Sequence, residues 1–387
     1  MRWASAHVLS HDAAEAAESV AFELAGALGP GPVDLALAFY SAPLAAAAER
    51  IAAVLRRALA PATLAGVPAR GIVSSAHEHE QGAALSVIAA RLPGVEVRPL
   101  LLVQEAWSDE VADAAAFDRL APRLRGAELA LFAADPFSLD GERVLALVNR
   151  FAPDVRMVGG FASASARPGG NWSFLNDWAS PEGGFMIALH GALRADVVVS
   201  QGCEPVGPVL EVTRARDLLI LELDGQPALA RIARVLGDLP EDGQARLRQG
   251  LYVGRPAHGD ASGRGGWLIR NLLGADREKG AIAVGDRIGA GEKIRLHVRD
   301  ADAAAADLGM LLSPQTFDSR AAAALLFACN GRGRALYGEP DRDIATLQAA
   351  LGGVPAAGMF CAGEVGPIGG RNFLHGHTAS IAIVRPR

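Results

Sequence analysis

The sequence predicts a fold between α/β and α+β, with two domains of mixed β-sheet and packed helices built from repeated βαβ-like units. Three observations predict it. An apolar strand–helix–strand pattern occurs three times, and the pattern of apolar and polar residues changes near residue 210. The chain of 387 residues is also longer than a single hydrophobic core usually supports. Of these residues 50% are hydrophobic and 21% are charged, which is typical of a globular protein.

Each copy of the pattern begins with an uninterrupted apolar run, continues into a helix and ends in a second run that passes through a glycine. The first runs cover 33–41, 129–134 and 324–329, and we expect the helices at about 44–59, 140–151 and 341–351. A phenylalanine and a glycine, about 30 residues apart as in a βαβ unit, mark the copies: Phe39 and Gly71, Phe132 and Gly159, Phe327 and Gly358. Unbroken apolar runs indicate strands buried on both faces. We therefore expect three parallel strand pairs whose ends share a sheet edge, where open α/β sheets bind ligands.

The chain between the second and third copies has a different pattern. Strand-like runs occur at 218–223, 250–253, 267–273, 280–284 and 293–298. Pro227 is a good first residue for a helix over 227–236, and Asp300 is a good N-cap for a helix that reaches Leu312. We place the domain boundary where this pattern starts, giving domains 1–212 and 213–387.

Charge and cysteine usage exclude several classes of protein. A net charge of -6 gives no broad basic field for nucleic acid or an anionic membrane. Acidic residues interrupt any apolar stretch in the first 30 residues, and no run reaches the roughly 18 apolar residues of a membrane span. The three cysteines are far apart and form no CxxC pair, which argues against a disulfide framework and a structural zinc site. We expect a cytoplasmic protein that contacts neither nucleic acid nor membrane.

The third copy carries the densest chemistry, beginning with a glycine-rich loop after its first strand. This loop reads Cys329-Asn330-Gly331-Arg332-Gly333-Arg334. Its glycines allow close backbone approach, and the two arginines offer forked donors for a carboxylate or phosphate. In the alternative interpretation the arginines pair with nearby acids and only hold the loop: Glu339, Asp341 or Asp343.

The second strand of the third copy leads into another polar run. Parallel pairing would bring Cys329 and Cys361 to neighbouring strand ends, with Glu364 on the same rim. His375 and His377, spaced i and i+2, would project to one face of a strand. Two histidines, a carboxylate and a thiol could bind zinc, ligate haem iron or form a Cys–His nucleophile pair. A strand histidine can also simply hydrogen-bond to the backbone.

Two further groups of polar residues lie outside the third copy. The run His77-Glu78-His79-Glu80 ends the first copy, and we favour a solvated edge over a metal site there. Arg270 and Arg299 lie in apolar strand patterns, where a charge needs a partner. Together with Arg332 they are candidates to converge on one acidic group, either a ligand or Glu364.

At these motifs the sequence resembles the FIST family. The run Gly363-Glu364-Val365-Gly366-Pro367, followed by Leu374-His375-Gly376-x-Thr378-Ala379-Ser380, is similar to the signature of the FIST C domain. Segments 327–334, 268–274 and 298–301 match the same domain, and segments 78–86, 134–137, 159–163 and 201–208 resemble FIST N motifs. One position departs from the family pattern: the place of His377 is usually aromatic, so an HxH metal site would not be part of the shared design.

The resemblance implies a sensory domain pair that binds small ligands such as amino acids. Family members are often fused to, or encoded near, kinases, chemoreceptors or cyclic-nucleotide enzymes, and some are haem proteins that sense nitric oxide. This chain has no room for such a module beside its FIST domains, so we expect it to signal through a separate partner protein. No residue role is carried over from the family.

We therefore expect a ligand-binding sensory protein for an amino acid or another anionic metabolite, with binding favoured over catalysis. The expected ligand-binding residues are Asn330, Arg332, Arg334, Cys361, Glu364, His375, Arg270 and Arg299. Three alternatives stay open: a haem-binding nitric-oxide sensor, an enzyme that uses a Cys/His pair, and a pure protein-interaction module.

Overall fold

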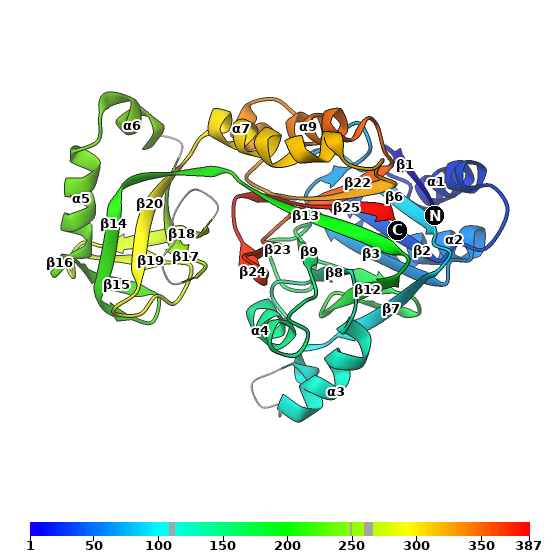
Figure 1. Ribbon diagram of the computed structural model, residues 1–387, viewed down its shortest axis with the longest axis horizontal. Coiled ribbons are helices and arrows are strands. Elements are labelled where there is room, and N and C mark those ends of the chain that lie inside the picture. The colour runs from blue at the N-terminus through cyan, green and yellow to red at the C-terminus, as the bar shows by residue number, and fades with distance from the viewer. Residues whose placement is uncertain (108–112, 248–249, 259–265) are drawn as a thin grey trace. The chain divides into compact units, whose positions relative to one another are not determined.

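The computed structural model describes residues 1–107, 113–247, 250–258 and 266–387 (Figure 1). These residues form two compact units. The first comprises Met1–Val199, Leu308–Leu374 and Thr378–Arg387, and the second comprises Ser200–Asp307 and His375–His377. The second unit is thus an insertion in the chain of the first, which differs from the expected division into 1–212 and 213–387.

The mixed α/β character and the three strand–helix–strand copies are confirmed. In each copy the two strands pair in parallel. The first copy is β2 (Leu35–Ser41), η1 (Ala42–Ala47), α2 (Ala48–Leu59) and β3 (Thr63–Ala69). The second is β8 (Leu129–Ala134), α4 (Gly141–Phe151) and β9 (Met157–Phe161). The third is β21 (Ala323–Cys329), α8 (Arg334–Tyr337), α9 (Arg342–Leu351) and β22 (Ala356–Cys361).

Each parallel pair is the centre of a six-stranded sheet in the described part of the chain. An antiparallel strand lies beside β2, β8 and β21, and an edge strand follows it. These outer strands are β6 (Leu85–Arg91) and β1 (Arg2–Val8), β12 (Gly184–Gly191) and β7 (Val95–Leu102), and β25 (Thr378–Pro386) and β13 (Leu193–Gln201). We call the three sheets the first, second and third sheet, after the copy that each contains.

Each copy donates the hairpin that follows it to a different sheet. Hairpin β4–β5 (Ile72–Val73, Glu78–His79) extends the third sheet at β22, and β10–β11 (Ser173–Leu175, Trp178–Ser180) extends the first sheet at β3. Hairpin β23–β24 (Glu364–Ile368, Arg371–His375) extends the second sheet at β9. The exchange is cyclic, so the three copies interlock and none is a separate domain.

The register identifies which residues of the three copies are equivalent. The donated hairpins pair with Gly66, Gly159 and Gly358. The glycine of the first copy is therefore Gly66 and not Gly71. Likewise Phe39 and Phe327 face the core between the sheets, whereas Ala133, one residue after Phe132, takes that place in the second copy.

The core of the first unit lies between the three sheets. Alternate residues of β2, β8 and β21 meet there, and the rings of Phe39 and Phe327 pack edge to face with centroids 5.9 Å apart. The other face of each sheet is covered by two helices. These are α1 (Ala13–Leu28) and α2, α3 (Asp113–Leu124) and α4, and α7 (Ala301–Leu312) and α9. Burial on both faces explains why the central strands read as unbroken apolar runs.

The second unit is an antiparallel barrel. Its strand order is β14-β20-β17-β18-β19-β15-β16, and an additional β14–β15 pairing closes it. The strands are β14 (Cys203–Arg216), β15 (Leu219–Leu223), β16 (Gln226–Pro227), β17 (Leu251–Pro256), β18 (Trp267–Asp276), β19 (Ala281–Val284) and β20 (Lys293–Arg299). Helices α5 (Ala228–Gly237) and α6 (Glu241–Arg246) follow β16. All five predicted strands and the helix near Pro227 are present, and Asp300 caps α7 by accepting from the Ala303 N–H at 2.8 Å.

Candidate functional site

The two strand ends of the third copy meet as the sequence predicts. Cys329 and Cys361 are direct register partners in the parallel β21–β22 pair. Neither cysteine is in a disulfide; Cys361 is fully buried and Cys329 is half-buried. Just past the strand the Asn330 N–H donates to the carbonyl oxygen of Cys361 at 3.0 Å, which ties the glycine-rich loop to the second strand.

Glu364 lies beside these strand ends, at the start of β23. It pairs with Gly160 of β9 and is fully buried. Its Oε2 accepts from the N–H and the hydroxyl of Thr378, at 3.1 and 2.9 Å. Its Oε1 is buried without a conventional hydrogen-bond partner among the described residues. Burial raises the pKa of the Glu364 carboxyl to about 8, although Thr378, the Arg332 charge and the Cys329 thiol all act to lower it.

Arg332 is buried in the loop and bound to a carboxylate of the same chain. Its Nε and Nη2 donate to the two oxygens of Asp343 at 2.6 and 2.7 Å, and Nη2 also donates to the Tyr337 hydroxyl at 2.7 Å. Burial lowers the pKa of this guanidinium, but the neighbouring Asp343 raises it more, so the net pKa lies above its ordinary value and the side chain stays charged. Its Nη1 is buried with no partner among the described residues.

The expected two-arginine cradle therefore does not form. Arg332 pairs with Asp343, as in the alternative interpretation, while the Arg334 side chain is exposed. The backbone N–H of Arg334 instead donates to Glu80 Oε1 at 2.8 Å. Gly333 has a φ of 57°, and a Cβ there would lie 2.6 Å from that same oxygen, so the loop needs a glycine at this position.

Glu78 is a buried structural acid that the sequence interpretation missed. It was expected on a solvated edge, yet it is 5% exposed. Its two oxygens accept from the N–H groups of Asp341 and Ile344, both at 3.0 Å, so it caps the start of α9 from another copy. Burial, followed by the Asp343 charge, raises the pKa of Glu78 to about 7. In the sequence, the signal that could have identified this role was the resemblance of Glu78-x-Glu80 to a family motif.

The two histidines of the HxH motif do not share a face of one strand. His375 ends β24 and is buried. His377 lies in the following turn with a φ of 62°. Its Nε2 is 3.0 Å from Asn271 Oδ1, and its ring centroid is 4.2 Å from that of Tyr252. The prediction of a common face is wrong because the chain turns between the two residues.

Arg270 and Arg299 belong to the second unit. The Arg270 Nε donates to Asp286 Oδ2 at 2.8 Å, so this arginine and Arg332 have separate acids. Their convergence on one ligand therefore stays a prediction. Arg299 ends β20, opposite Cys203 of β14.

Metal and haem sites receive no direct support. Among the described residues no group of three or more histidines, cysteines and acids could hold a metal ion. Three cavities elsewhere in the first unit contain none of the expected site residues. Haem binding therefore stays a prediction, and a visible absorption spectrum of haem-supplied protein tests it.

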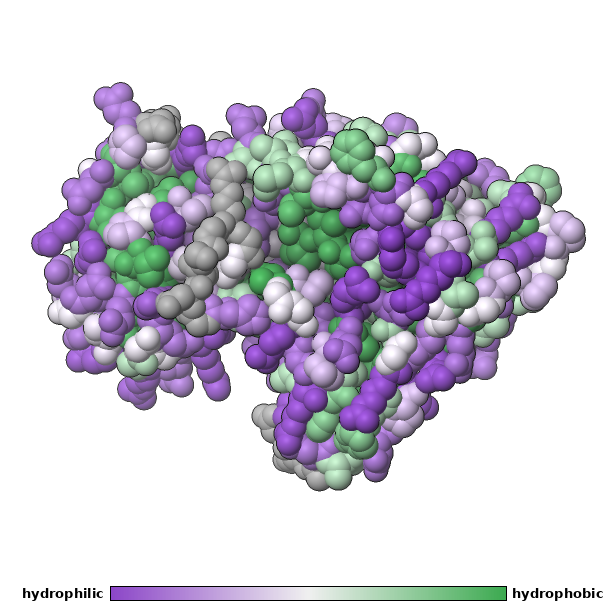
Figure 2. Space-filling view, in the orientation of Figure 1, coloured by the Kyte–Doolittle hydropathy of each residue, from purple (hydrophilic) through white to green (hydrophobic). Residues whose placement is uncertain are grey.

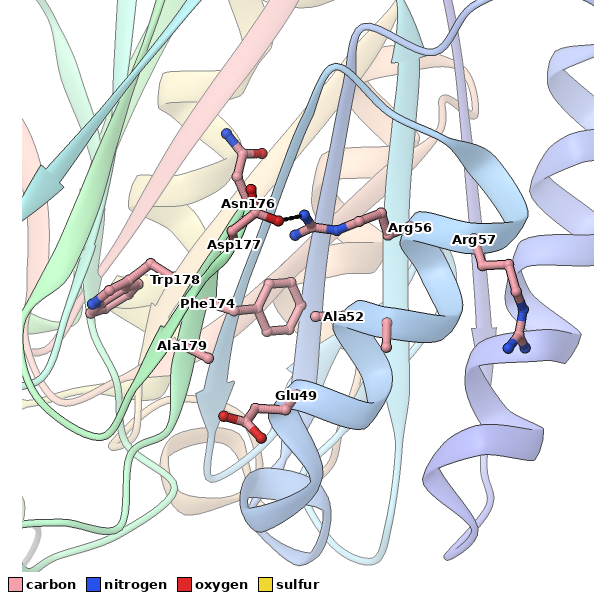
Figure 3. Close-up of a pocket in the computed structure, with 10 residues that line it drawn as sticks. Glu49, Ala52, Arg56, Arg57, Phe174, Asn176, Asp177, Trp178 and Ala179 are labelled. Carbon is pink, nitrogen blue, oxygen red and sulfur yellow. Dashed lines mark hydrogen bonds and ion pairs between the residues drawn. The ribbon is translucent and has the colours of Figure 1, made fainter.

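One of these cavities is an open pocket of about 530 Å³ between α2 and hairpin β10–β11 (Figure 3). Phe174 forms its floor, and Arg56 reaches across from α2 to form an ion pair with Asp177. The Asp177 side chain is 95% exposed, so this ion pair at the rim of the pocket is solvated and contributes little to the stability of the chain.

Comparisons with known proteins give both a family and close relatives. The model of the FIST N domain matches residues 34–226, and that of the FIST C domain matches residues 228–367. An uncharacterised protein of Mycobacterium tuberculosis is 37% identical over 381 residues, covering 96% of this chain and 95% of its own. One from Mycobacterium bovis is 38% identical over 341 residues, covering 87% and 86%.

Solved structures offer only distant likeness. A cyanuric acid hydrolase from A. caulinodans aligns with 100% of this chain and 99% of its own, at 7% identity and a TM-score of 0.40. A second cyanuric acid hydrolase aligns with 100% of both chains at 10% identity and a TM-score of 0.34. Neither likeness is close enough to carry a conclusion. In the described residues no helix is long and apolar enough to cross a membrane. With both domain models matched in order and relatives aligned along nearly its full length, the chain belongs to the FIST family.

Proposed function

We propose that this protein is a cytoplasmic small-ligand sensor that binds its ligand beside Glu364 and signals through a separate protein. FIST domains are a family of small-ligand sensory domains in signalling proteins. The observation that carries the proposal is a set of three buried polar atoms without conventional hydrogen-bond partners among the described residues: Asn330 Oδ1, Arg332 Nη1 and Glu364 Oε1. The Cys329 thiol, a weak donor, is the remaining neighbour of the Glu364 carboxyl.

These three atoms belong to one part of the first unit. Asn330 and Arg332 lie in the loop after β21, and the Arg332 charge acts on Glu364. Buried polar groups are nearly always paired in folded proteins, and an unpaired one costs about 1–3 kcal/mol. A ligand that pairs all three would recover that cost. Asn330, Arg332 and Glu364 are therefore its proposed contacts.

The charges favour a particular class of ligand. Arg332 and Asp343 neutralise one another, and a carboxyl with a pKa near 8 is mostly protonated at neutral pH. The site is therefore close to neutral and suits a small zwitterion better than a highly charged anion. An amino acid would offer an ammonium to Glu364 and a carboxylate to Arg332 Nη1.

A thermal-shift screen over amino acids and related metabolites tests the proposal. A ligand at 100 times its Kd stabilises the folded chain by about 2.7 kcal/mol. We expect Glu364→Gln and Asn330→Ala to abolish this gain, because glutamine cannot ionise to hold an ammonium and alanine removes the open Asn330 oxygen. The matched control is Glu339→Gln, an exposed acid on the same segment. A gain that is unchanged in both site variants would refute the site.

The partner surface is proposed near the same sheet. Met310 of α7 and Phe317 of η4 (Ser313–Phe317) are exposed by 63% and 88%, which is unusual for such large apolar side chains. The surface seen in Figure 2 likewise carries apolar residues among hydrophilic ones. If a partner binds the chain with equal affinity with and without every ligand screened, the protein is an interaction module and not a sensor.

A further inference from the structure

The third copy holds two cysteines in a geometry that allows a covalent bond between them. Cys329 and Cys361 are register partners on neighbouring strands. Neighbouring strands lie about 4.8 Å apart, and disulfides join residues whose Cα atoms are about 4.4–6.8 Å apart. Both residues are the last of their strands, so a bond between them would join the two strand ends.

The two sulfur atoms also face the same acid. A side chain at Gly160 would place its Cβ 2.7 Å from the Cys361 sulfur, so a glycine leaves the room that this thiol fills. Gly160 is the register partner of Glu364. The Cys329 thiol is a hydrogen-bond neighbour of the same Glu364 carboxyl. Glu364 thus lies beside both thiols.

The environments of the two thiols differ. Cys329 is half-buried, its sulfur accepts from the Gly331 N–H at 3.4 Å, and the Arg332 charge acts on it. A backbone N–H and a nearby cation both stabilise a thiolate. Cys361 is completely buried, and burial raises the pKa of its thiol well above the ordinary value. Cys329 is therefore suited to react first, and Cys361 to react only with a sulfur placed beside it.

We propose that Cys329 and Cys361 are a redox pair that a hydroperoxide converts into a cross-strand disulfide, with Glu364 as the proton acceptor. The fraction of Glu364 that is ionised takes the Cys329 proton, and the thiolate attacks the hydroperoxide. An S–O bond forms, the O–O bond breaks, and the leaving oxygen takes the proton from Glu364 as water or an alcohol. The product is a sulfenic acid on Cys329.

The second step closes the disulfide. The Cys361 sulfur attacks that of Cys329, the S–S bond forms and the S–O bond breaks, and hydroxide leaves with the Cys361 proton as water. In total two thiols lose two electrons and two protons, and the hydroperoxide is reduced. Oxidation of this cysteine pair is a second signal that the third copy receives, and it does not depend on ligand binding.

Intact-mass analysis of the full chain tests the pair. We expect one equivalent of hydrogen peroxide to remove the mass of two hydrogen atoms, and a non-reducing peptide map to link the Cys329 and Cys361 peptides. Cys361→Ser should stop at a Cys329 sulfenic acid that dimedone captures, whereas Cys329→Ser should block oxidation. Cys203→Ser, which changes a buried cysteine of the second unit, is the matched control and should behave as the natural chain.

The natural chain alone provides a second test should a variant fail to fold. Brief alkylation under native conditions should label Cys329 before Cys361 and Cys203. A peroxide-treated chain that keeps all three thiols, or that forms its link through Cys203, would overturn the proposal. Labelling of the three cysteines at one common rate would overturn it as well.

Discussion

Arg332 and Asp343 form a two-point ion pair, 2.6 and 2.7 Å long, in which each side chain is only 1% exposed. The arginine belongs to the loop after β21 and the acid to the first turn of α9, so the pair fixes the loop against the helix. With Nε and Nη2 engaged, only Nη1 stays open toward a ligand. Arg332 thus mainly holds the loop in place, and only its Nη1 is left to contact a ligand.

We expect Asp343→Asn to destabilise the chain by about 3–5 kcal/mol, because it leaves a buried arginine without its counter-charge. Urea denaturation at neutral pH measures this. The control is Arg342→Gln, which breaks the exposed Arg342–Glu339 pair and should cost at most about 1 kcal/mol. Equal losses in the two variants would mean that the buried pair has no special role.

Glu78→Ala should unfold the start of α9 locally. The Glu78 oxygens hold the N–H groups of Asp341 and Ile344, and losing a cap of this kind costs about 0.5–2 kcal/mol. Hydrogen exchange should therefore become faster at the first turn of α9. Asp140, the cap of α4, gives the matched control: Asp140→Ala should expose the start of α4 and leave α9 protected. Unchanged exchange at Ile344 in Glu78→Ala would contradict the capping role.

Glu364 should make the stability of the chain fall as pH rises. Its pKa is about 8 in the folded chain and 4.5 ordinarily, so between these values the folded state binds more protons than the unfolded state. We expect Glu364→Gln to gain stability relative to the natural chain over this range, by on the order of 5 kcal/mol at its upper end. Urea titrations across the range measure it, with Glu339→Gln as control. A difference that does not change with pH would exclude a neutral buried Glu364.

Ligand binding should also depend on the ionisation of the Glu364 carboxyl. An ammonium group needs the ionised form of Glu364, so binding below pH 8 must release a proton. We expect affinity for such a ligand to rise about tenfold per pH unit up to that value. The charged and titratable neighbours of Glu364 are Arg332, Cys329 and Cys361, and none of them reverses this sign. Calorimetry in two buffers of different ionisation enthalpy detects the proton, and its absence would rule out an ammonium at Glu364.

Local patterns predicted the three strand–helix–strand copies because their causes are local. The apolar runs mark strands buried on both faces, and the cap Asp140 marks the start of α4 within one residue. The parallel pairing of Cys329 with Cys361 followed from the same pattern. These features need no knowledge of the other copies.

The exchanged hairpins were not predictable in the same way. Glu364 follows the third copy in the sequence but pairs with β9 of the second sheet. Contacts between segments far apart in the sequence decide that pairing. The buried role of Glu78 depends on α9 of another copy, so its local pattern resembled a solvated edge. Gly71 and Phe132 marked the wrong positions. The equivalent residues are Gly66, five residues before Gly71, and Ala133, one residue after Phe132, and only the strand register reveals these offsets.

The close approach of β21 and β22 can be tested at Gly358. A Cβ there would lie 1.8 Å from the Leu326 carbonyl oxygen, where backbone cannot yield easily. Gly358→Ala should therefore destabilise the chain by at least about 1–3 kcal/mol through overpacking, measured by urea denaturation. The control is Gly26→Ala in α1, where the new methyl meets nothing within 4 Å and alanine should add about 0.5–1 kcal/mol of stability. If Gly358→Ala is as stable as the natural chain, the close approach of β21 and β22 at this position is wrong.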